Sequence, residues 1–229
     1  MKTGREIACL LSHKCNVESH KIGSDLQKIL ASFDVQCEID PFPPGYDVSF
    51  RMQTFEIETV IFLSSTESID SMFCQQELQA AMRQGLPIFT AYVSGILPTW
   101  LKKRVVWHVP LRNDTEFVTG AQILATSIRE RVLFHRQVRL LYPENDYFET
   151  IEAARNIALE GERTLIAEYA CELARRYRHI TDPSTLYWIA VALGKANTPQ
   201  AAKLLDHLPK GNHPLISEGI RQAREFMCD

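Results

Sequence analysis

An aromatic side chain and a carboxylate lie four residues apart in this chain, close enough to act together. Phe73 and Glu77 share one face of a predicted helix at that spacing. The run Ser64-Ser65-Thr66 precedes the helix and leaves the carboxyl end of a predicted strand. In an open parallel sheet, ligands bind outside these strand ends. The pair can therefore stack on a ligand ring and hold a sugar hydroxyl, whereas a solvated glutamate beside an incidental phenylalanine is the simpler alternative.

The elements that must position this pair alternate between strands and helices over about the first 130 residues. Short apolar runs alternate there with amphipathic stretches, which is typical of an α/β sheet protein. We expect strands at 7–11, 35–39, 59–63, 86–93 and 105–109. We expect helices at 18–33, 48–57, 71–84 and from 116 to about 131 or a little beyond. Three prolines and a glycine make 40–47 a loop.

Composition and charge exclude several classes of protein. Of the 229 residues, 45% are hydrophobic and 23% are charged, which excludes a disordered chain. The formal net charge is -3, so there is no basic field to attract nucleic acid or anionic lipid. We therefore expect no direct binding to nucleic acid. No apolar run reaches the roughly 18 residues of a membrane span, so we also expect no membrane association.

The cysteines favour a reduced protein without a zinc site. None of the six cysteines forms a C-x-x-C pair, and their scatter suits neither a zinc site nor a disulfide framework. Cytoplasm is therefore the expected compartment. Four of the six cysteines have apolar neighbours in the sequence and are predicted to be core residues: Cys9, Cys37, Cys74 and Cys171.

The chain after residue 140 contains only helical patterns. We therefore predict an α/β domain at 1–140 and an all-α domain at 141–229. The first helices of the all-α domain are expected at 146–160 and 162–177. Three later helices are expected to begin at prolines spaced by 16 and then 15 residues: Pro183, Pro199 and Pro214. That spacing resembles helical-repeat (HEAT- or TPR-like) arrays, and a small bundle that shields the first domain is the alternative.

Several motifs of the first domain occur together in a recognisable order. They are Leu11-Ser12-His13, Pro44-Gly45, Leu63-Ser64-Ser65, Phe73-Cys74-x-x-Glu77-Leu78 and Gly85-Leu86-Pro87-Ile88. In this order they resemble a TIR (Toll/interleukin-1 receptor-like) domain over about residues 5–131. The resemblance implies a flavodoxin-like fold with a five-stranded parallel sheet. It also implies cleavage of NAD+ at the nicotinamide–ribose bond, with Glu77 as the catalytic residue.

The same resemblance suggests the rest of the site and its regulation. The loop at 40–47 corresponds to the family's BB loop, which gates the site and mediates assembly. We expect NAD+ to be a substrate, with no cofactor and no metal. The expected substrate-binding residues are Ser12, His13, Phe42, Tyr46, Ser64 and Phe73.

The expected function is an assembly-activated immune effector of the antiviral-defence kind. It would self-associate through the TIR-like domain as a dimer or filament, and the helical tail would bind a protein partner or activator.

Three other functions remain open from the sequence. The first is a non-catalytic TIR adaptor or scaffold. The second is a TIR cyclase that makes a cyclic ADP-ribose signal. The third is an enzyme similar to nucleoside deoxyribosyltransferases, which have a related fold and also use a glutamate on ribose.

Overall fold

The first part of the chain forms a parallel β-sheet covered by helices. The computed structural model describes residues 6–14, 16–39, 47–92, 97, 99–102, 107–111, 114–142, 144–208 and 213–228. Its strands are β1 (Ile7–Ser12), β2 (Val35–Ile39), β3 (Thr59–Ser64), β4 (Ile88–Tyr92) and β5 (Trp107–Pro110). They are parallel and lie side by side in the order β2-β1-β3-β4-β5. The predicted α/β class is confirmed.

The helices of this part largely follow the apolar periodicity of the sequence. They are α1 (Val17–Ala31), α2 (Val48–Thr54), α3 (Thr66–Asp70), α4 (Met72–Gln84), α5 (Thr99–Lys102) and α6 (Asp114–Leu140). Two short helices, α3 and α5, were not expected. The expected end of α6 near residue 131 is wrong, because this helix continues unbroken to Leu140.

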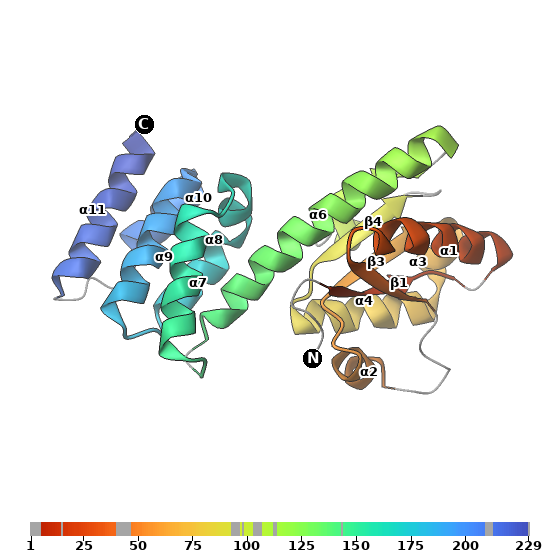
Figure 1. Ribbon diagram of the computed structural model, residues 1–229, viewed down its shortest axis with the longest axis horizontal. Helices are drawn as coiled ribbons and strands as arrows, with labels where there is room; N and C mark the ends of the chain where they lie inside the picture. Colours follow the sequence, from red (N-terminus) through yellow and green to blue (C-terminus); the bar gives the residue numbers. More distant parts are fainter. Residues whose placement is uncertain are drawn as a thin grey trace. The chain divides into compact units, whose positions relative to one another are not determined.

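Two apolar cores lie on opposite faces of the sheet. One joins Cys9, Leu11 and Leu63 of the strands to buried residues of α1 and α6. The other joins Leu10 and Phe62 to buried residues of α2, α4 and α5. Figure 1 shows α1 and α4 against the sheet. Because neighbouring residues of a strand point to opposite faces, β1, β3 and β4 contribute alternately to both cores.

The second part of the chain contains helices only. They are α7 (Tyr147–Leu159), α8 (Arg163–Tyr177), α9 (Pro183–Ala196), α10 (Pro199–Asp206) and α11 (Pro214–Cys228). The predicted starts at the three prolines are confirmed. Asp182 and Thr198 cap α9 and α10 by accepting hydrogen bonds from the backbone N–H groups of Thr185 and Ala201, at 2.6 and 3.1 Å.

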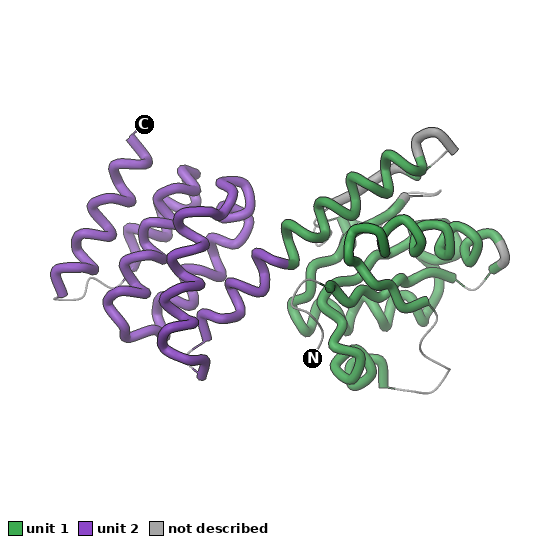
Figure 2. Tube along the Cα trace, viewed as in Figure 1, with its two compact units in different colours: residues 1–132 green, residues 133–229 purple. Residues whose placement is uncertain are grey.

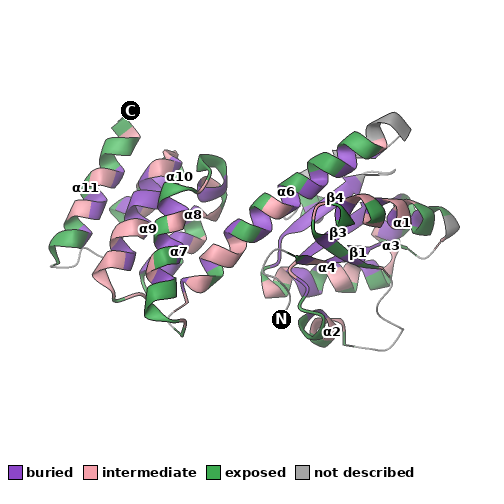
Figure 3. Cartoon of the chain, in the orientation of Figure 1, coloured by how far each residue is buried: buried purple, intermediate pink, exposed green. Residues whose placement is uncertain are grey.

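Helix α9 lies at the centre of this all-α part. It packs against α7, α8, α10 and α11, so these contacts join helices no more than two positions apart along the chain. Most of α9 is buried, as Figure 3 shows. Two glycines let α11 approach it closely. A Cβ at Gly194 would overlap the backbone of Ala223, and one at Gly219 would lie 2.9 Å from Cα of Tyr187.

The chain divides into two compact units, Met1–Val132 and Leu133–Asp229 (Figure 2). We call them unit 1 and unit 2. The division lies inside α6 rather than after residue 140, because Phe134 and Val138 near the end of that helix, and Leu141 just after it, pack into the core of unit 2. No helix within the described part of the chain is long and apolar enough to cross a membrane.

Candidate active site

Two serine hydroxyls belong to the carboxyl ends of neighbouring strands. Ser12 ends β1 and Ser64 ends β3, and Ser12 is paired in register with Phe62. Strand alternation places both serines on the face whose core contains Leu10 and Phe62. Helix α4 covers that face. The chain runs from β1 to β2 on one side and returns to β3 on the other, so β1 and β3 flank the topological switch point where open α/β sheets bind ligands.

Helix α4 holds Glu77 over these strand ends. Cys74, Leu78 and Ala81 recur at helical spacing and are buried in the core beneath the helix. Glu77 lies three residues after Cys74 and four before Ala81, so it flanks that buried stripe. Its side chain is only partly exposed. The apolar stripe of α4 therefore determines how the helix is turned on the sheet and on which side of it Glu77 lies.

Ser12 and Glu77 are joined by a short hydrogen bond. The Ser12 hydroxyl donates to Oε2 of Glu77 at 2.5 Å, a length typical of a charge-assisted bond. Cys74 lies beside both residues. Burial raises the pKa of the Cys74 thiol, and the charge of Glu77 raises it further, against a hydrogen bond from Ser71 that lowers it. Ser12, Cys74 and Glu77 thus form one cluster, in which Ser12 and Cys74 are buried and Glu77 is partly exposed.

A second hydroxyl cluster joins the two strand ends. The hydroxyls of Ser65 and Ser68 are 2.9 Å apart, and Ser65 caps α3 by accepting from the Ser68 backbone N–H at 3.1 Å. The backbone N–H of Lys14, just after β1, donates to the Ser68 hydroxyl at 3.2 Å. Sequence reasoning missed Ser68, although Ser65 followed by the first-turn acid Glu67 is a signal for a capped helix.

The hydroxyl of Ser64 is buried at the end of β3. The residue is 0% exposed, and its hydroxyl has no hydrogen-bond partner among the residues that the structure describes. An unsatisfied buried hydroxyl costs about 1–3 kcal/mol, so such groups are uncommon outside sites that bind something.

The other expected site residues lie elsewhere or differ in exposure. His13 packs against α1, on the opposite side from Glu77: its ring lies 6.1 Å from that of His20, and Cδ2 is 3.8 Å from the position of a Cβ on Gly23. Phe73 is 50% exposed at the start of α4. The expected residues Phe42 and Tyr46 lie outside the described residues.

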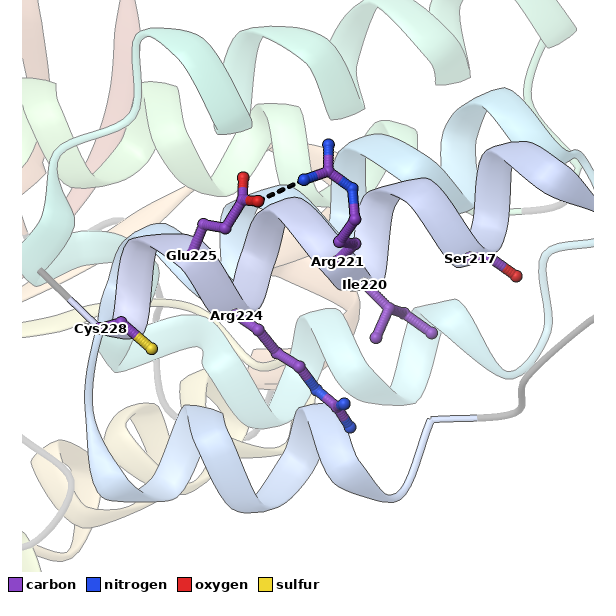
Figure 4. A pocket seen from close by; sticks show the side chains of 6 residues that line it. All are labelled: Ser217, Ile220, Arg221, Arg224, Glu225 and Cys228. Carbon is purple, nitrogen blue, oxygen red and sulfur yellow. Dashed lines mark hydrogen bonds and ion pairs between the residues drawn. The ribbon is translucent and has the colours of Figure 1, made fainter.

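Unit 2 contains a hollow of its own. It has a volume of about 490 Å³ and is lined by residues of α11 alone (Figure 4). Its arginines are engaged with carboxylates, since Arg221 binds Glu218 and Glu225 and Arg224 binds Asp206 at 3.3 Å. The hollow therefore lacks the unpaired charge that a binding site for an anion needs.

The described residues contain no cluster of three or more histidine, cysteine, aspartate or glutamate side chains that could hold a metal ion. The chain matches no family model, no curated protein and no solved structure. The site must therefore be interpreted from its own chemistry.

Proposed function

We propose that unit 1 is a TIR-type NAD+ glycohydrolase with a flavodoxin-like, five-stranded sheet. One observation supports this proposal most directly. A partly exposed carboxylate, Glu77, is held by the Ser12 hydroxyl beside the carboxyl ends of β1 and β3, where this sheet topology binds ligands. The order of the TIR-like motifs in the sequence supports it independently.

The proposed reaction is hydrolysis of the bond between nicotinamide and ribose. The nicotinamide nitrogen takes the bonding electron pair and leaves neutral, so no general acid has to protonate it. The ribose C1′ develops oxocarbenium character, as in glycoside hydrolysis. The negative charge of Glu77 stabilises that positive charge and binds ribose hydroxyls. Water then adds to C1′ and releases a proton, which gives ADP-ribose. If an internal nucleophile of the substrate attacks instead, the product is a cyclic ADP-ribose.

The remaining contacts of the substrate are proposed from the resemblance. Phe73, half exposed one helical turn before Glu77, is suited to stack on a ring of the substrate. Phe42 or Tyr46 would stack on a ring of the substrate from the loop at 40–47. His13 and Ser64 are buried, and His13 packs against α1 on the opposite side from Glu77, so we assign neither of them a substrate contact.

Regulation is proposed to act through assembly. A site that cleaves NAD+ is damaging if it is always open. We therefore expect self-association of unit 1, as a dimer or filament, to reposition the loop at 40–47. Unit 2, a helical-repeat-like module in this proposal, would bind the activating protein partner of a cytoplasmic immune response.

The test is NAD+ consumption with separation of the products, by full-length protein at low and high concentration with a crowding agent. The native protein is compared with Glu77→Gln and with Glu130→Gln, which alters an exposed carboxylate on α6. We expect the first variant to lose at least about 100-fold in rate and the second to be unaffected. A linear product identifies a hydrolase and a cyclic product a cyclase.

Two outcomes would change the proposed function. If concentrated native protein leaves NAD+ intact, the scaffold alternative becomes the better supported function, and an enzyme that needs its activating partner is the other. If nucleosides are cleaved instead of NAD+, the transferase-like alternative replaces it.

A further inference from the structure

Ser12 is too deeply buried to meet a substrate directly. It is 1% exposed at the end of β1, beneath the helix that carries Glu77. Its side chain has one hydroxyl proton, and that proton is directed to Oε2 of Glu77. The prediction that Ser12 binds the substrate directly is therefore replaced by an indirect role. Any effect of this hydroxyl reaches the substrate through the Glu77 carboxylate.

The hydrogen bond from Ser12 restrains a side chain that can adopt many rotamers. A glutamate has a long, rotamer-rich side chain, and this one is only partly buried. Cys74 and Leu78 anchor the backbone of α4 in the core beneath the helix. A hydrogen bond from a strand residue, Ser12, connects the carboxylate to the rigid sheet.

We infer that Ser12 is a positioning residue, which fixes the orientation of the Glu77 carboxylate and does not contact the substrate. The effect that this inference predicts on kcat and KM rests on the proposed function, NAD+ cleavage. Loss of the hydroxyl leaves the substrate contacts in place and displaces the carboxylate from the position where positive charge develops. A preorganised group contributes mainly to the transition state, so the loss falls on kcat rather than on KM.

Ser64 provides a matched control in the same setting. It is equally buried, ends the neighbouring strand on the same face, and loses the same single oxygen when changed to alanine. Its hydroxyl makes no hydrogen bond to Glu77 among the described residues. A general disturbance of the strand ends would therefore appear in both variants, whereas loss of the positioning bond appears only in Ser12→Ala.

The first arm of the experiment does not depend on activity. The protein is labelled with ¹³C at glutamate carboxyl carbons, and the Glu77 resonance is assigned by its absence from Glu77→Gln. We expect this resonance to shift in Ser12→Ala and to keep its native position in Ser64→Ala. Ser12→Cys, which keeps a similar volume but donates weakly, is expected to give an intermediate shift.

The second arm measures NAD+ cleavage. We expect Ser12→Ala to lower kcat about 10- to 100-fold with KM within about twofold of the native value, and Ser12→Cys to recover part of kcat. A raised KM with unchanged kcat would overturn the inference and leave the proposed function intact. An unmoved Glu77 resonance in Ser12→Ala would overturn it even in a protein that cleaves no NAD+. Equal shifts in Ser12→Ala and Ser64→Ala would also overturn it.

Discussion

The two units bury polar side chains in different ways. In unit 2 the two buried threonines make local hydrogen bonds near helix starts: Thr150 donates to the Asp146 carbonyl oxygen at 2.8 Å, and Thr185 donates to Asp182 at 2.7 Å. In unit 1 buried polar residues gather where β1 and β3 end: Ser12, His13, Ser64, Ser65 and Ser68. One of these hydroxyls, on Ser64, makes no hydrogen bond among the described residues. The buried threonines of unit 2 thus stabilise the first turns of α7 and α9, whereas unit 1 gathers buried hydroxyls at two strand ends and bonds one of them, on Ser12, to Glu77.

The largest expected difference between the units is in thiol reactivity. Cys9, Cys37 and Cys74 of unit 1 are buried, whereas Cys171 and Cys228 of unit 2 are exposed. Buried thiols react only after opening, so we expect iodoacetamide to label the unit 2 cysteines more than about 1,000-fold faster. Peptide mass spectrometry over time measures this ratio. Rapid labelling of Cys9 or Cys37 in native protein would show that unit 1 opens readily and would weaken the comparison.

The next effect concerns the close contact between α9 and α11. Any side chain at Gly194 overlaps the backbone of Ala223. We expect Gly194→Val to lower the free energy of unfolding by about 3 kcal/mol, because the two helices must separate. Urea denaturation measures the loss. Ser184→Val, which places the same side chain on the first turn of α9, is the control and is expected to cost less than about 1 kcal/mol. Similar losses in the two variants would contradict the packing argument.

A smaller effect tests the difference in buried hydroxyls directly. Thr185→Val removes a bonded hydroxyl at constant shape and is expected to cost about 1 kcal/mol. Ser64→Ala removes a hydroxyl with no described partner and is expected to be neutral or slightly stabilising. The free energies of unfolding of the two variants decide the point. If Ser64→Ala costs as much as Thr185→Val, the Ser64 hydroxyl is satisfied and the two units are alike in this respect.

The smallest effect is a dependence of unit 2 stability on pH. Burial opposes ionisation of Glu172, but hydrogen bonds and charges from Arg175 and Arg176 prevail and hold its pKa below the usual value. A lowered folded-state pKa stabilises the fold above the unfolded-state pKa of about 4.3 and loses that contribution as pH falls through the folded-state value. Native protein should therefore exceed Glu172→Gln in stability near neutral pH, and the difference should shrink in acid.

Urea denaturation over a pH series measures this difference. Glu152→Gln, at an exposed position on α7, is the control and should show little difference at any pH. A gap between native protein and Glu172→Gln that widens in acid would show that the sign is wrong.

Local signals in the sequence predicted most secondary structure. Strand β2 has the predicted limits 35–39, and α9, α10 and α11 begin at their prolines. These features depend on neighbouring residues: apolar periodicity, a capping oxygen and the fixed φ of proline. Histidine is not among the residue types preferred at a helix N-cap. His213 nevertheless accepts a hydrogen bond from the Leu215 backbone N–H through Nδ1 at 3.3 Å.

Two local expectations are wrong for identifiable reasons. Cys171 has apolar neighbours in the sequence, but one residue along a helix turns about 100°, which carries it away from the buried Ala170 into solvent. The end of α6 was misplaced because its apolar face continues past Arg131 into the core of a second unit. Nothing near residue 131 in the sequence ends the helix, and tertiary packing determines how far it extends.

The candidate site shows the same division between local and tertiary information. The sequence by itself determined that Phe73 and Glu77 share a helix face and that serines follow two strands, because both facts depend on spacing. Only the tertiary structure joined Ser12 to Glu77, across 65 positions of sequence, by placing β1 beside β3 under α4. It also turned His13 to the opposite face, since adjacent residues at a strand end point to opposite sides of the sheet.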